Sequence, residues 1–102
     1  MHFFDPHLPY TSPLGDQPIF RNRGYDAEIA FADGQLGRLV QWLDRTGQRE
    51  KTIILVVSDH GESLGEHEEA THGMFIYNST MKVPMILNAP ACLPNTWRCG
   101  MC

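Results

Sequence analysis

The stretch "TIILVVSDHGESLGEH" at residues 52–67 decides the fold. Its first part, residues 52–57, is a continuous run of β-branched and leucine side chains that is too short for a core helix. Such a run is typical of a strand that is covered on both faces in a parallel sheet. Asp59 and His60 follow this run almost at once. Because ligands collect beyond the carboxyl ends of the strands in such sheets, the sequence predicts a functional site here.

Residues 25–46 are predicted to form one amphipathic helix. Apolar side chains recur there at the spacing of a single helix face. They are Ile29, Ala32, Leu36, Leu39, Val40 and Leu43. Gly47 is expected to end the helix, because glycine is favoured directly after a helix C-terminus.

Two further strands are predicted at residues 2–4 and 83–87. Residues 5–18 hold four prolines and one glycine and are therefore predicted to be a loop. The order strand, loop, helix, strand, loop, strand indicates an α/β fold with a mostly parallel sheet. We expect residues 1–90 to form this domain.

The charge balance argues against nucleic acid as a partner. Eight Lys and Arg residues stand against twelve Asp and Glu residues, which gives a net charge of -4 without a basic stripe. No apolar stretch is long enough to cross a bilayer, so we expect no membrane span in this chain. The first ten residues lack the features of a secretory signal, and the sequence leaves the compartment undetermined.

All three cysteines lie near the end of the chain, at Cys92, Cys99 and Cys102. The "CGMC" segment has the spacing of a redox motif or of half a zinc site, but a thioredoxin motif precedes a helix within a βαβ unit, and here the sequence stops. Residues 91–102 show neither a helical nor a strand period. We therefore interpret them as an irregular tail and assign its cysteines no role.

Asp59 and His60 support two interpretations. A carboxylate oxygen and an imidazole nitrogen are a good partial ligand set for a divalent metal, and Gly61 gives the backbone freedom to turn both side chains toward one point. The same residue types also favour tight turns and helix N-caps. Composition alone leaves these two interpretations equally open.

His7 and His72 are candidate catalytic residues. His7 lies in the proline-rich loop, and His72 precedes the last predicted strand, so both would reach the Asp59 site if the sheet is parallel. Two imidazoles beside a metal suit anion binding and proton donation to a leaving oxygen. The alternative is that each is a surface or hydrogen-bonding histidine.

Four segments, in this order, resemble the sulfatases of the alkaline phosphatase superfamily. They are "HFFDPHLPY", "YDAEIAFADGQLGRLVQWLDRTG", "TIILVVSDHGESLGEH" and "THGMFIYNSTMKVPMIL", and together they cover most of residues 2–90. The resemblance implies a three-layer α/β/α sandwich. It also implies hydrolysis of sulfate esters with a divalent metal, usually calcium, and a formylglycine made from a cysteine or serine.

The resemblance assigns roles to four residues and favours the metal interpretation. Asp59 and His60 match the second pair of metal ligands. His7, in "HLP", matches the histidine of an H-x-P loop that contacts the ester group. His72 occupies the place of the basic residue that steadies the sulfate or protonates the leaving oxygen.

Two features of such enzymes are missing from the sequence. It has neither the C-x-P-S-R or S-x-P-S-R segment that supplies the nucleophile nor the acidic pair of ligands near the start. We therefore expect a partial catalytic domain that is inactive alone, with the rest of the domain missing and an apolar strand open to aggregation. The resemblance is compatible with a periplasmic or secreted parent.

His60 keeps alternatives open, because many sulfatases have asparagine at this position. A histidine is similar to the phosphodiester and phosphonate monoester hydrolases of the superfamily, and a nitrogen ligand shifts metal preference from calcium toward manganese or zinc. The first interpretation is a sulfatase that acts on a small-molecule or carbohydrate sulfate ester. The alternatives are such a phosphodiester or phosphonate hydrolase, or a non-catalytic remnant.

Overall fold

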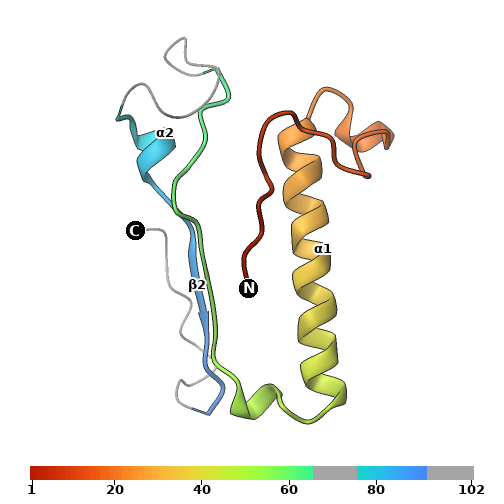
Figure 1. Cartoon of the computed structure of the whole chain (residues 1–102), viewed down its shortest axis with the longest axis vertical. Helices are drawn as coiled ribbons and strands as arrows, with labels where there is room; N and C mark the ends of the chain where they lie inside the picture. The colour runs from red at the N-terminus through yellow and green to blue at the C-terminus, as the bar shows by residue number, and fades with distance from the viewer. Residues whose placement is uncertain (66–75, 92–102) are drawn as a thin grey trace. The chain divides into compact units, whose positions relative to one another are not determined.

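The computed structural model describes residues 1–65 and 76–91 (Figure 1). The chain divides into two units, residues 1–49 and residues 50–102. The position of one unit relative to the other is not determined, so each is described by itself.

The first unit is built on one long helix, α1 (Gly24–Arg45), which follows a short 3₁₀ helix, η1 (Pro18–Phe20). This confirms the helix predicted from the apolar spacing. Gly47 ends it with a φ of 66°, a left-handed conformation that glycine adopts without strain. Its N–H donates to the carbonyl of Asp44, and the N–H of Gln48 donates to the carbonyl of Leu43, at 3.1 and 2.9 Å. This pair of bonds is the Schellman arrangement and satisfies two carbonyls of the last turn.

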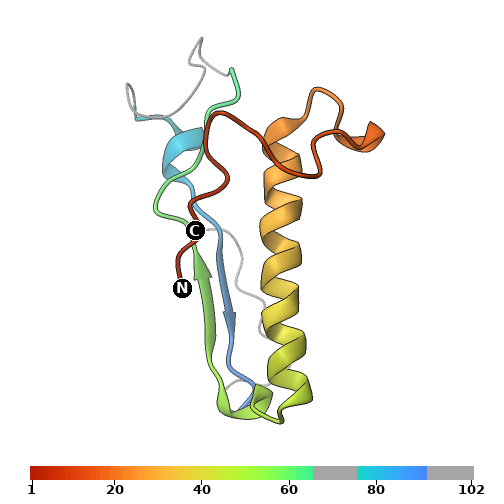
Figure 2. The same cartoon turned by 45° about the vertical axis from the view of Figure 1, so that its right-hand side comes forward.

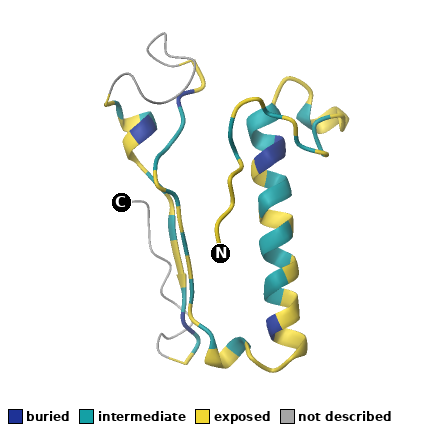
Figure 3. Ribbon diagram, in the orientation of Figure 1, coloured by how far each residue is buried: buried dark blue, intermediate teal, exposed yellow. Residues whose placement is uncertain are grey.

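Within this chain the apolar stripe of α1 is only partly covered (Figure 3). Leu43 is buried near the end of the helix, and Ala27 is buried near its start. Ile29 of the stripe is exposed, and so is Trp42, which lies on another side of the helix. The helix therefore has more apolar surface than its own unit covers.

The chain before α1 folds back over the start of the helix (Figure 2). The approach is close, because a Cβ added to Gly24 would lie 2.8 Å from the Cβ of Tyr10. Tyr10 and Tyr25 also meet edge to face, with ring centroids 5.7 Å apart. The strand predicted at residues 2–4 is not formed among the described residues, because a strand needs a neighbour for its backbone groups and these residues pair with none.

The second unit contains a two-stranded sheet. A 3₁₀ helix, η2 (Arg49–Lys51), spans the boundary between the units, and the second unit continues with β1 (Ile54–Val57), α2 (Asn78–Met81) and β2 (Met85–Asn88). β1 and β2 lie side by side and antiparallel, with Leu55 opposite Leu87. Both strands lie within the ranges predicted from the sequence or one residue beyond them, whereas α2 was not predicted.

The sheet differs from the mostly parallel one that was predicted. The two strands of the described chain pair antiparallel, and neither a parallel sheet nor the three-layer sandwich is confirmed. Leu55 and Val57 are 57% and 56% exposed, so β1 is not covered on both faces within this chain. The physical reason is that a continuous apolar run indicates how much burial a strand needs and carries no information on the direction of its partner.

Among the described residues, no helix combines the length and the apolar character that crossing a bilayer requires. The predicted tail at residues 91–102 lies outside the described chain except for its first residue.

Candidate functional site

The chain turns sharply where β1 ends. The hydroxyl of Ser58 donates to the carbonyl oxygen of His60 at 2.6 Å, and the N–H of His60 donates to Oδ1 of Asp59 at 3.1 Å. Such local bonds are typical of a turn built by serine and aspartate. The turn interpretation of this segment therefore holds for its backbone, and it does not exclude a metal at the side chains.

The two predicted ligand side chains lie together. Oδ1 of Asp59 is 3.8 Å from Nε2 of His60, and the side chains are 83% and 41% exposed. Nδ1 of His60 lies 2.7 Å from the carbonyl oxygen of Gly61. Because a carbonyl only accepts, this contact assigns the ring proton to Nδ1 and leaves the lone pair on Nε2. That is the tautomer in which Nε2 can act as a metal ligand.

The distance between the two donor atoms allows one divalent cation to contact both. Two bonds of roughly 2.0–2.2 Å each span more than the distance between Oδ1 and Nε2, so one ion can reach both atoms. One hard oxygen and one imidazole nitrogen suit manganese or zinc, and calcium prefers an all-oxygen set. Across residues 1–65 and 76–91, no group of three or more His, Cys, Asp or Glu side chains is arranged to hold a metal ion. Asp59 and His60 are therefore half of a site at most.

Gly61 anchors the turn to α2. Its N–H donates to the carbonyl oxygen of Thr80 at 2.8 Å, and a Cβ at this position would fall on the carbonyl oxygen of Ser79. Thr80 is buried, and its hydroxyl donates to the carbonyl of Tyr77 and accepts from the N–H of the same residue. The residue that follows Asp59 and His60 is thus hydrogen-bonded to a capped helical turn.

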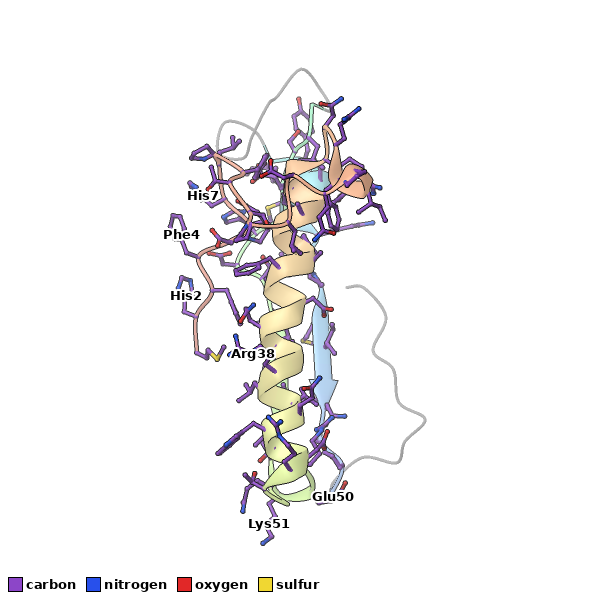
Figure 4. All side chains as sticks on the ribbon, turned by 90° about the vertical axis from the view of Figure 1, so that its right-hand side faces the viewer. His2, Phe4, His7, Arg38, Glu50 and Lys51 are labelled. Carbon is purple, nitrogen blue, oxygen red and sulfur yellow. The ribbon has the colours of Figure 1, made fainter. Side chains whose placement is uncertain are left out.

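His7 belongs to the first unit, in the loop that folds over α1. Its Nδ1 lies 2.7 Å from the carbonyl oxygen of Leu8, and its ring lies 4.6 Å from that of Phe4 (Figure 4). Its backbone N–H donates to Oε2 of Glu28 at 2.9 Å. As in His60, the carbonyl contact assigns the proton to Nδ1 in the neutral ring.

Asp59 and His60 lie close together after β1, and their role as metal ligands stays a prediction. His7 lies in the other unit, and His72 lies outside the described residues, so its role stays a prediction. The cysteines of the tail also lie outside them: Cys92, Cys99 and Cys102.

Sequence reasoning missed Glu28 and Thr80. Glu28 lies in the first turns of α1 and is only 3% exposed. The amphipathic pattern around it gave no reason to expect a buried carboxylate there. Thr80 follows a tyrosine by three residues, and a threonine at this spacing is a weak signal for a capped turn. The sequence around Glu28 and Thr80 does not indicate which loop each residue contacts.

Comparison with known proteins identifies the family. Residues 1–95 match the family model described as Sulfatase. The uncharacterized sulfatase YidJ of Escherichia coli K12 is 35% identical over 79 residues, and human iduronate 2-sulfatase is 37% identical over 88 residues; these cover 78% and 81% of this chain. The multifunctional alkaline phosphatase superfamily protein PehA of Trinickia caryophylli is 39% identical over 64 residues, or 62% of the chain. No solved structure matches significantly.

The matched regions are small parts of these relatives. They amount to 16% of YidJ, 16% of iduronate 2-sulfatase and 12% of PehA. The family match itself extends over nearly the whole of the present chain. Because this match covers residues 1–95, the chain belongs to the sulfatase family.

Proposed function

We propose that this chain carries half of the metal and substrate site of a sulfuric ester hydrolase. The observation that carries the proposal is the Asp59–His60 pair, whose oxygen and nitrogen donors lie 3.8 Å apart directly after β1. The bond from Nδ1 of His60 to Gly61 supports it, because it orients the ring as a ligand. Sulfatases generally use a divalent metal, which agrees with such a pair.

Oδ1 of Asp59 and Nε2 of His60 would hold the metal, together with ligands from the rest of the catalytic domain. A bound divalent cation polarises the ester oxygens and stabilises the charge that develops on them. Family resemblance favours calcium, while the nitrogen of His60 favours manganese or zinc.

The two other histidines act on the ester itself. His7 binds an oxygen of the sulfate group by donating from Nε2, which requires the doubly protonated ring because the proton on Nδ1 is already donated to the carbonyl of Leu8. His72 steadies the sulfate or gives a proton to the leaving oxygen, a role that suits an imidazole. The nucleophile comes from a segment that this sequence does not contain. The substrate is a small-molecule or carbohydrate sulfate ester.

The test uses the enzyme expressed from the complete reading frame that includes these residues. We expect it to hydrolyse an aryl sulfate, and we expect His7→Ala to lower kcat/KM for that ester by roughly 100-fold or more. Phe4→Leu is a matched loop control, because it keeps an apolar side chain beside the ring and should cost far less. An enzyme that leaves every sulfate ester untouched would refute the proposal.

A second candidate function is hydrolysis of phosphodiesters or phosphonate monoesters. It is favoured by His60, because a histidine at this position resembles the phosphodiester and phosphonate monoester hydrolases of the superfamily. The similarity to PehA, described as a multifunctional alkaline phosphatase superfamily protein, agrees with a wider range of reactions than sulfate ester hydrolysis. Comparing kcat/KM for an aryl sulfate with that for an aryl phosphodiester separates the two. Much faster cleavage of the phosphodiester, with the sulfate untouched, would establish this second function instead.

The third possibility is a non-catalytic remnant. The coding sequence upstream of Met1 distinguishes it from an enzyme. An upstream open frame with a C-x-P-S-R or S-x-P-S-R segment supports the enzyme. A stop codon and a promoter directly before Met1 would support the remnant.

A further inference from the structure

Glu28 is a buried carboxylate with no place in the reaction proposed above. It is 3% exposed, and both of its oxygens accept backbone hydrogen bonds from the loop that precedes α1. Oε2 accepts from the N–H of His7 at 2.9 Å, and Oε1 accepts from the N–H of Thr11 at 2.8 Å. Burying a carboxylate is costly unless it is hydrogen-bonded, and bonds to a charged acceptor are stronger than neutral ones.

The two bonds fix the loop at two points four residues apart. The oxygens of one carboxylate are held in a rigid plane, so together they determine where His7 and Thr11 sit above the helix. The hydroxyl of Ser12 adds a third anchor by donating to the carbonyl of Ala27 at 3.0 Å. The close approach of Tyr10 to Gly24 adds a fourth.

The ring of His7 is held separately from its backbone. Nδ1 is bonded to the carbonyl of Leu8, and Phe4 lies against the ring (Figure 4). With the backbone fixed by Glu28 and the ring fixed by these two neighbours, Nε2 has one defined direction. That is the atom assigned to the ester group.

We propose that Glu28 is a positioning residue for His7, an inference that rests on the proposed function through the role of His7. Its carboxylate holds the loop so that Nε2 of His7 meets the sulfate oxygen without reorganisation. Misplacing a group of this kind by about 1 Å can cost on the order of 100-fold in rate. Glu28 touches neither substrate nor metal in this scheme.

The variant that tests it is Glu28→Gln in the complete enzyme. The amide oxygen still accepts one backbone bond, while the amide nitrogen faces the second N–H and cannot accept. We expect kcat/KM for an aryl sulfate to fall roughly 10- to 100-fold, with metal content unchanged. Asp26→Asn is the matched control: Asp26 lies two residues earlier on the same helix but bonds to the side chain of Arg23, so kcat/KM should stay the same.

A double-mutant cycle separates positioning from a general loss of structure. If Glu28 acts through His7, then Glu28→Gln should change kcat/KM by less than about twofold when His7 is already alanine. The same 10- to 100-fold loss in both backgrounds would overturn the inference. So would full activity of Glu28→Gln in the presence of His7.

Amide hydrogen exchange tests the geometry even if the variant folds poorly. The N–H groups of His7 and Thr11 should exchange slowly in the unmodified enzyme and roughly tenfold or more faster in Glu28→Gln. Unprotected amides in the unmodified enzyme would overturn the inference. If these amides are protected and His7→Ala nevertheless keeps full activity, the proposed role of His7 fails, and the positioning role fails with it. If His7→Ala is impaired and Glu28→Gln is not, only the inference about Glu28 fails.

Discussion

The N–H of Gly61 donates a hydrogen bond of 2.8 Å to the carbonyl oxygen of Thr80, which ties the turn after β1 to the helical turn before β2. The two segments are far apart in sequence and adjacent in the second unit. The bond begins at the residue after His60, so α2 supports the backbone that presents Asp59 and His60. A side chain at position 61 has no room, since its Cβ would fall on the carbonyl of Ser79.

Gly61→Ala is therefore expected to displace the turn. Moving the backbone next to His60 disturbs the Nδ1 bond that orients the ring, and loss of such outer contacts typically lowers metal affinity 10- to 100-fold. Titration of the metal into the complete, metal-free enzyme measures this loss. Gly34→Ala is the control, because nothing lies within 4 Å of its added Cβ on α1, and affinity should not change. An unchanged affinity in Gly61→Ala would show that the packing against α2 is irrelevant to the site.

His60→Asn is expected to change which metal is bound. The variant replaces a nitrogen donor by an amide oxygen, and oxygen donors favour calcium over zinc and manganese. Competition between calcium and manganese, read out by elemental analysis of the purified enzyme, should shift toward calcium. His2→Asn removes an exposed histidine of the other unit and should leave the ratio as it was. No shift in His60→Asn would argue that position 60 does not contact the metal.

The 102-residue chain alone is expected to self-associate. Leu55 and Leu87 lie opposite each other in the sheet and are 57% and 40% exposed, and a two-stranded sheet leaves backbone groups unpaired along its outer edges. Sedimentation velocity should show oligomers at micromolar concentrations, and Leu55→Lys should reduce them. Ile19→Lys, which places the same charge on an exposed residue of the first unit, should reduce them less. A monodisperse monomer would contradict this expectation.

The 102-residue chain alone is also expected to have no sulfatase activity. It contains neither a C-x-P-S-R nor an S-x-P-S-R segment, so no residue can supply the expected nucleophile. Incubation with a chromogenic aryl sulfate and excess calcium or manganese should release no product above the buffer rate. Metal-dependent turnover that disappears in Asp59→Ala would show that a different nucleophile operates.

Local signals in the sequence were sufficient for the helix and for the position of the strands. The helix is fixed by apolar spacing between residues 25 and 46, and its end is fixed by Gly47, whose left-handed φ only glycine adopts freely. The strand after it is fixed by the run that contains Ile54–Val57. In each case the deciding information lies within a few residues of the element.

The remaining features depend on partners far away in the chain. β2 is antiparallel because its backbone pairs with β1 in that direction. An apolar run in the sequence does not specify the direction of the neighbouring strand. The burial of Glu28 depends on the loop folding back over α1, and the sequence pattern of the helix is the same without that contact. That Asp59 and His60 lie side by side after β1 follows from their adjacent positions in the sequence, and their role as metal ligands stays a prediction.

The metal content of Asp59→Ala tests the central claim most directly. Asp59 supplies one of the two donors that the described chain brings together, so removing its carboxylate should abolish metal retention and sulfate ester hydrolysis in the complete enzyme. Asp33→Ala, which removes an exposed carboxylate from α1, should keep both. Elemental analysis of the two variants after gel filtration is predicted to find metal only in Asp33→Ala. A normal metal content in Asp59→Ala would contradict the assignment of the pair as ligands.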